Sequence, residues 1–154
     1  MEPRLYRGPD GTYIDTMKKL LIAVDGSEAS LKGARTAQTL AQALKAEAQF
    51  IFVVPPMILP GDAPFAPMEE IHEAEVKRGQ RVLDDVATKL GMAEVVRHVK
   101  VGPPAETIAE VAELENADLV VVGSTGKGAV KRLLVGSTAD RLVHISRRPV
   151  LVVH

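Results

Sequence analysis

The feature that most limits the fold is the alternation of short apolar runs with amphipathic stretches along the chain. Runs rich in Val, Leu and Ile predict five buried strands, at residues 19–25, 48–54, 94–101, 118–123 and 149–154. Apolar residues at helical spacing predict four helices, at residues 27–45, 68–90, 103–116 and 137–146. Strands that alternate with helices predict an α/β domain: an open, five-stranded parallel sheet with right-handed crossovers and helices on both faces.

The residues within each run indicate where its strand lies in the sheet. Four of the runs are almost continuously apolar, as in strands that are covered on both faces. The run at residues 94–101 alternates more, so we expect this strand at an edge. Residues 1–16 precede the first strand and are interpreted as an N-terminal extension, whereas residues 17–154 form a single domain. The proline-rich residues 55–68 predict a long loop that is either a lid or an interface segment.

The composition excludes several classes of function. The chain has no Cys, which rules out disulfides, thiolate catalysis and Cys-ligated zinc. A net charge of −1 and 3% aromatic residues argue against nucleic acid as a partner. The longest apolar run, residues 50–59, is interrupted by Pro55 and Pro56, so we expect no membrane span and a cytoplasmic protein. The four histidines show no metal-ligand spacing, and no metal site formed by the protein is predicted.

Charge is unevenly distributed over the second half of the chain. Residues 124–148 contain six basic residues and one acidic residue, whereas residues 104–118 contain five acidic residues and no basic one. Two interpretations stay open at this point. The segments are either two solvated faces of opposite charge, or the basic segment is part of an anion-binding site.

The stretch VVVGSTGKGAVKRLLVGST, at residues 120–138, resembles a phosphate-binding loop at first sight. A Walker A loop fails because Gly123 is two residues too close to the Gly126-Lys127 pair. The dinucleotide-binding fingerprint also fails, since the first βα turn lacks its glycine spacing. Glycines after a strand nevertheless allow positive φ and a close approach of a ligand to the backbone. The alternative is that these glycines only form a turn.

The last helix begins directly after Gly136. Ser137 is expected to open it, with Asp140 three residues later as an approximate capping box. The free N–H groups of a helix start, together with the helix dipole, can bind an anion. The alternative is that Ser137 serves only as a cap.

The pattern G-x2-G-x9-G-[ST], formed by Gly123, Gly126, Gly136 and Ser137, resembles the nucleotide-site signature of the universal stress protein family. Three further segments are similar to the family in the same order: AVDGSE at residues 23–28, VGPPAETI at 101–108 and RRPVLVVH at 147–154. The resemblance covers residues 17–154. One departure is Phe52, which stands where many members have His at the end of the second strand.

The resemblance implies the adenine nucleotide alpha hydrolase-like fold, with strand order 3-2-1-4-5, and a protein of the ATP-binding branch. Ligands of such sheets bind where the strand order reverses, here between the strands that end near Asp25 and Gly123. The residues that the family pattern assigns to the nucleotide are Val24, Asp25, Val53, Gly123, Gly126, Gly136, Ser137 and Thr138. In this pattern Asp25 contacts the adenine or ribose end and the two valines enclose the base. The rest hold the ribose and phosphates.

Several of these assignments have structural alternatives. Asp25 can instead cap the first helix, because Asp-x-x-Glu28 fits a capping box. The two valines would be buried in any version of this fold. Lys127 and Lys131 are additional candidates for phosphate contacts, although the family pattern leaves their positions variable.

The expected function is an ATP-binding regulator or sensor in a stress response, with Mg²⁺ or Mn²⁺ accompanying the nucleotide. We see no general base, so hydrolysis is expected to be weak or absent, and no catalytic residue is assigned. The apolar last strand, residues 149–154, lies at an edge in the implied order and predicts a homodimer. Two alternatives stay open: a slow nucleotide hydrolase or transferase, and an interaction module whose protein partner binds at residues 55–68. ATP is not distinguished from AMP or a cyclic nucleotide.

Overall fold

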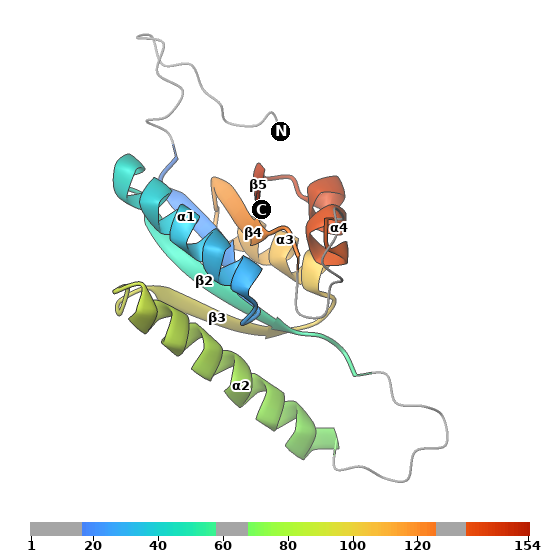
Figure 1. The fold of residues 1–154 in the computed structure, drawn as a ribbon. Coiled ribbons are helices and arrows are strands. Elements are labelled where there is room, and N and C mark those ends of the chain that lie inside the picture. Colours follow the sequence, from blue (N-terminus) through green and yellow to red (C-terminus); the bar gives the residue numbers. More distant parts are fainter. Residues whose placement is uncertain (1–16, 58–67, 126–134) are drawn as a thin grey trace.

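The computed structural model describes residues 17–57, 68–125 and 135–154 (Figure 1). The strands are β1 (Lys19–Ala23), β2 (Glu47–Val54), β3 (Val96–Val101), β4 (Leu119–Gly123) and β5 (Val150–Val153). The helices are α1 (Glu28–Leu44), α2 (Met68–Lys89), α3 (Pro104–Leu114) and α4 (Ser137–Ile145). Each element lies within two residues of the bounds predicted from the periodicity of its apolar residues.

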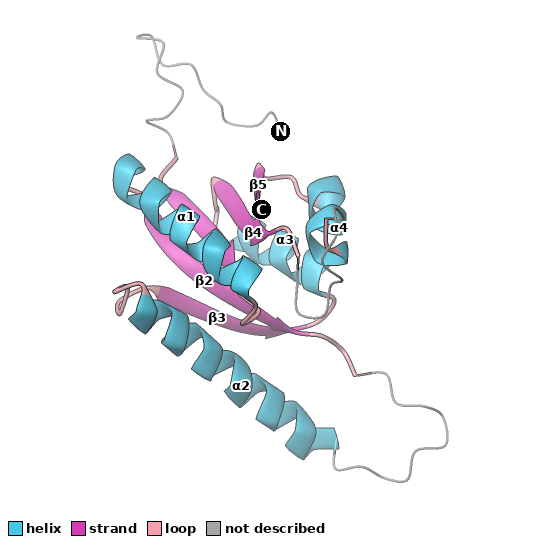
Figure 2. Ribbon diagram, in the orientation of Figure 1, coloured by secondary structure: helices cyan, strands magenta, loops and turns pink. Residues whose placement is uncertain are grey.

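The five strands form one sheet in the order β3-β2-β1-β4-β5, and all four pairings are parallel (Figure 2). The predicted fold class and strand order are therefore confirmed. The strands β3 and β5 are the two edges, as the alternating pattern of the third strand and the resemblance had indicated. The order reverses between β1 and β4, which are neighbours in the sheet although far apart in the sequence.

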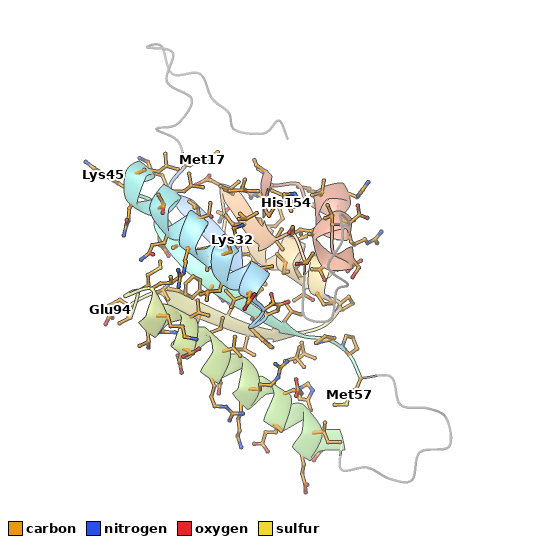
Figure 3. All side chains as sticks on the ribbon, in the orientation of Figure 1. Met17, Lys32, Lys45, Met57, Glu94 and His154 are labelled. Atoms are coloured by element: carbon orange, nitrogen blue, oxygen red, sulfur yellow. The ribbon has the colours of Figure 1, made fainter. Side chains whose placement is uncertain are left out.

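Helices cover both faces of the sheet and divide the core in two. One cluster joins α1 and α2 to alternate strand residues such as Ile22, Phe50 and Val121. The other joins α3 and α4 to the intervening residues, such as Leu21, Ile51 and Val120. Side chains fill the space between sheet and helices (Figure 3). Neighbouring strand residues are thus buried on opposite faces, which explains why these runs are continuously apolar.

The start of α1 lies unusually close to the end of β4. A Cβ atom added to Gly123 would lie 2.7 Å from the backbone C and O of Ala29. The Cβ of a residue at Gly33, on the same helix, would lie 3.4 Å from the backbone N of Gly123. Because real Cβ atoms do not approach backbone atoms this closely, only glycine at position 123 allows this packing.

The contact with Ala29 gives a reason for glycine at position 123 other than the backbone freedom considered in the sequence analysis. Neither Gly123 nor Gly136, whose φ is −60°, has the positive φ that glycine allows. The turn that requires glycine is instead the one after β1, where Gly26 has a φ of 85°. Gly123 is required by helix packing, and it remains a candidate ligand contact through its backbone only.

Some of the sequence-based assignments lie outside the described residues. These are the extension at residues 1–16, residues 58–67 of the proline-rich loop, and Gly126, Lys127 and Lys131. Among the helices that the structure describes, none has the length and apolar character that crossing a membrane requires.

Candidate functional site

A crevice opens at the carboxyl ends of β1 and β4 because the two strands continue in different directions. Their pairing ends at Ile22 and Val121. Beyond it, the N–H of Val24 donates to the carbonyl of Ile51 on β2, at 2.9 Å. The N–H of Ser124 donates to the carbonyl of Val153 on β5, at 2.8 Å. Each strand thus follows its outer neighbour, which is the geometry expected where the strand order reverses.

A cavity of about 460 Å³ occupies this crevice. Its walls come from the ends of β1, β2 and β4, from α2, and from the starts of α1, α3 and α4. Seven of the ten residues proposed from the sequence line it: Val24, Asp25, Val53, Gly123, Gly136, Ser137 and Thr138. The structure therefore brings together every proposed residue that it describes, from four separate parts of the chain.

The two valines reach the cavity from opposite faces of the sheet. Val24 is 2% exposed and belongs to the core beneath α1 and α2. Val53 is half-buried and packs against the core on the α3 and α4 side. Both therefore add apolar surface to the cavity wall, and apolar side chains form most of the lining of small-molecule sites.

Side chains cap the start of α1 and support the turn that precedes it. Ser27 is the N-cap, and its Oγ accepts a hydrogen bond from the N–H of Ser30 at 3.1 Å. The Oδ1 of Asp25 accepts from the N–H of Ser27 at 2.8 Å. The buried Ser30 hydroxyl accepts from the N–H of Asp25 at 3.3 Å and donates to the carbonyl of Ser27 at 3.0 Å. Asp25 therefore supports the turn, but the N-cap itself is Ser27 and not Asp25.

The start of α4 differs from that of α1. Its N-cap is Gly136, and no side-chain cap hydrogen bond is present within the described residues. The N–H of Gly136 donates to the carbonyl of Ser124 at 2.5 Å, which fixes the turn, and the N–H of Asp140 is the first to bond back, to the carbonyl of Gly136. The N–H groups of Ser137, Thr138 and Ala139 thus belong to a first turn that no side chain caps, and all three residues line the cavity.

This geometry corrects the expected capping box. Ser137 is the first residue of the helix, so its hydroxyl cannot serve as the N-cap. Asp140 is exposed, and its carboxylate lies 4.0 Å from the imidazole of His144 on the next turn. The physical reason is that Gly136, which has no side chain, adopts the extended conformation of the cap one residue earlier than the sequence pattern suggested.

The oppositely charged segments lie side by side, because α3 and α4 pack against each other. Arg141 on α4 contacts Glu106 on α3 at 2.9 Å, and Arg148 contacts Glu113 at 2.7 Å. The hydrogen bond from Arg141 lowers the pKa of Glu106 below its ordinary value. Two of the six basic residues are therefore paired with carboxylates, which argues against an anion site formed by this segment as a whole.

Sequence reasoning missed several residues of the cavity wall. They are Ser30, Ile51, Pro55, Arg78, Pro104, Ile108 and Thr125, together with residues adjacent to the predicted ones. Pro104 and Ile108 lie within the segment that carried the family resemblance, which was a usable signal. Arg78 had none, because nothing in the local sequence KRG distinguishes it from a solvated charge on a helix.

The part of the chain that the structure describes contains no group of three or more His, Asp or Glu residues that could hold a metal ion. Three of the histidines are exposed; His98 is partly buried, and its Nε2 lies 2.8 Å from the Oε1 of Gln49. Burial lowers the pKa of His98, with Lys100 and Lys19 acting in the same direction and Glu115 opposing them. This pair lies at β2 and β3 and does not line the cavity.

Comparison with known proteins shows which family this chain resembles. The model of the Universal stress protein family matches residues 16–154. A universal stress protein of Methanocaldococcus jannaschii is 35% identical over 139 residues, covering 88% of this chain and 81% of that protein. Among solved structures, universal stress protein UspA from Lactobacillus plantarum aligns with a TM-score of 0.73 and 26% identity, covering 90% and 98% of the two chains. A universal stress protein in complex with cAMP aligns with a TM-score of 0.65 and 25% identity, covering 89% and 97%.

Proposed function

The chain belongs to the universal stress protein family, and from this premise we propose that it binds an adenine nucleotide in the crevice between β1 and β4. The observation that carries the proposal is the uncapped start of α4 at the wall of the cavity. Ser137, Thr138 and Ala139 present backbone N–H groups at the positive end of the helix dipole, which is where anions bind in many proteins. The cAMP complex of a similar protein supports a nucleotide as the source of that anion.

In the proposed arrangement the phosphates lie at the start of α4 and the base lies toward the end of β2. The Ser137 hydroxyl and the backbone of Gly136 and Thr138 hold the phosphates. Val24 and Val53 enclose the base, and Asp25 contacts the ribose or the base edge from the turn that its hydrogen bond to Ser27 fixes. Gly126, Lys127 and Lys131 are further candidates for the phosphate side. A Mg²⁺ or Mn²⁺ ion would be bound by the phosphates, which neutralise it there.

We assign the bound protein a regulatory role rather than rapid catalysis. Asp25 is the acidic residue of the cavity wall, and its Oδ1 accepts a hydrogen bond from the turn of α1. A general base must be held within hydrogen-bond reach of the attacking water, and the contact with the turn instead gives Asp25 a part in the structure of the start of α1. ATP would act here as a ligand that stabilises one state of the domain, with weak or no hydrolysis.

The test measures whether the full chain carries bound nucleotide and whether nucleotides raise its thermal stability. The purified protein is denatured, and the supernatant is analysed for released adenine nucleotide. Thermal unfolding is then measured with Mg-ATP, Mg-AMP and cAMP, and with CTP as the control. A nucleotide at 100 times its dissociation constant adds about 2.7 kcal/mol, which for a domain of this size raises the Tm by roughly 5–10 °C.

The outcomes separate the candidate functions. Released nucleotide, or a Tm shift with adenine nucleotides that exceeds the shift with CTP, supports the proposal. Absence of both contradicts it and favours the interaction module. Steady phosphate release of several turnovers per second would favour the enzyme instead.

We also propose that the protein is a homodimer through β5. The four residues of this strand are half-buried, and β4 covers only one of its two edges in the described structure. The carbonyls of Pro149 and Val153 bond to β4, so by the alternation of a strand the N–H of Val152 points to the open edge. Val152→Pro removes that donor and is expected to halve the mass measured by light scattering from a dimer to the 16.5 kDa chain. An unchanged dimer would place the interface elsewhere.

A further inference from the structure

Arg78 brings a cationic side chain to the cavity from α2. It lines the cavity together with Phe52 and Pro55 at the end of β2. Its Nε donates to the Oε2 of Glu75, one turn earlier, at 3.0 Å, and its Cζ lies 5.2 Å from the centre of the Phe52 ring. Among the described residues, no acceptor is bonded to its two terminal nitrogens. They are therefore the donors that Arg78 can offer to a ligand.

The backbone of α2 packs directly against the ring of Phe52. The ring is 2% exposed and lies against Gly79, where an added Cβ atom would be 2.6 Å from Cδ1 of the ring. A larger residue at this position would force the Phe52 ring or the helix to shift, and with either of them the contact between Arg78 and the ring. The helix contact, the ion pair with Glu75 and the cation–π contact with Phe52 thus fix the guanidinium before a ligand arrives.

Arg78 and the start of α4 reach the cavity from opposite sides. Phe52 belongs to the core beneath α1 and α2, whereas Ala139 belongs to the core beneath α3 and α4. Figure 1 shows α2 and α4 on opposite faces of the sheet. A nucleotide whose phosphates lie at α4 therefore directs its other end, the base, toward the end of β2 and Arg78.

The ion pair of Arg78 indicates which kind of ligand group its side chain can bind. Glu75 pairs with it at 3.0 Å, and both side chains are about one third exposed, at 34% and 36%. A guanidinium that is already paired with a carboxylate attracts a second anion weakly, but its remaining N–H groups still donate to neutral acceptors. The ring nitrogens of adenine are acceptors of this kind.

We propose that Arg78 is a specificity-determining residue of the nucleotide site, whose terminal N–H groups donate to acceptor atoms on the edge of the purine base. The inference rests on the proposed nucleotide binding and adds the residue that recognises the base. It assigns a polar donor to the side of the pocket that Phe52 and Pro55 line.

The test compares the full-length protein with Arg78→Met, which keeps the length of the side chain and removes its donors. Dissociation constants for ATP, ADP and AMP are measured by calorimetry. We expect all three to weaken by the same factor, about tenfold, because the lost contact is to the base that they share. Arg81→Met is the matched control, since Arg81 is exposed on the same helix and does not line the cavity. It should change none of the three constants.

Each other outcome contradicts the inference in a distinct way. A loss that grows from AMP to ATP would make Arg78 a phosphate contact, and unchanged constants would leave it a purely structural residue. If the unsubstituted protein binds none of the three nucleotides, the proposed function fails and this inference fails with it. If Arg78→Met does not fold, Arg78→Gln, which keeps an amide donor, replaces it, and a loss of about threefold, equal for the three ligands, is then expected.

Discussion

The starts of α1 and α4 both face the cavity, at the carboxyl ends of neighbouring strands, yet they differ in how their N–H groups are satisfied. At α1, oxygens of Asp25, Ser27 and Ser30 accept hydrogen bonds from backbone N–H groups, and Glu28 adds a negative charge in the first turn. At α4, the cap is Gly136 and no described side chain takes this role. The start of α1 therefore has a side-chain cap, whereas the start of α4 has none among the described residues.

The difference teaches that a helix start becomes an anion site only where the chain leaves its donors to a ligand. Backbone N–H groups that lack a protein partner must bind water or another molecule. The side-chain cap of α1 stabilises the fold, whereas the uncapped N–H groups of α4 are available to bind a ligand. Substitutions at the first should therefore change stability, and substitutions at the second should change affinity.

The largest expected effect concerns the glycine that allows α1 to approach β4. Gly123→Ala places a Cβ atom 2.7 Å from the backbone of Ala29, which cannot move without displacing the helix. We expect the free energy of unfolding to fall by about 3 kcal/mol, measured by urea denaturation. Gly91→Asn is the control, because nothing lies within 4 Å of an added Cβ there and Asn tolerates the φ of 64°. Equal losses for the two variants would show that the contact is not tight.

The next prediction gives α4 the kind of cap that α1 has. Gly136→Asp introduces a carboxylate at the N-cap, which should accept from the first-turn N–H groups and repel phosphates. The affinity for ATP is expected to fall about 30-fold, close to 2 kcal/mol, while the protein becomes slightly more stable. Gly136→Ala, which fits a φ of −60°, adds bulk without a cap and serves as the control in the same titration. Retained affinity in the aspartate variant would mean that the phosphates do not bind at α4.

Removing the cap of α1 should affect stability alone. Ser27→Ala deletes the Oγ that accepts from Ser30 N–H, at a cost of about 1 kcal/mol. Chemical denaturation measures this loss, and calorimetry should give an ATP affinity within about twofold of the original. A substantial loss of affinity would imply that the two helix starts are coupled across the cavity, and the comparison would then fail.

The smallest effect is expected at Ser137, the first residue of α4. Ser137→Ala removes a hydroxyl that lines the cavity and forms no hydrogen bond to the described residues. Stability should be unchanged, whereas the affinity for ATP should fall about threefold, or roughly 0.7 kcal/mol. Thr138→Val tests whether the neighbouring hydroxyl contributes in the same way. A loss of stability without a loss of affinity at Ser137 would make it a structural residue like Ser27.

Much of this molecule could be predicted from the sequence because the relevant signals are local. The spacing of apolar residues placed every strand and helix to within two residues, since burial on one or two faces determines that spacing. The motif around Gly136 and Ser137 indicated a helix start at the cavity. Its cap was misplaced by one residue, because a pattern of Ser and Asp does not reveal which residue adopts the extended conformation.

The sequence by itself determined the elements, their order along the chain and, through the family resemblance, the crevice in which they meet. The tertiary structure alone decided which residues face one another there. It made Gly123 a contact for α1, paired the basic residues of α4 with α3, and brought Arg78 over Phe52 beside the cavity. These facts depend on which helix packs on which strand and at what distance. Such contacts join residues far apart in the chain, and no local pattern of side chains encodes them.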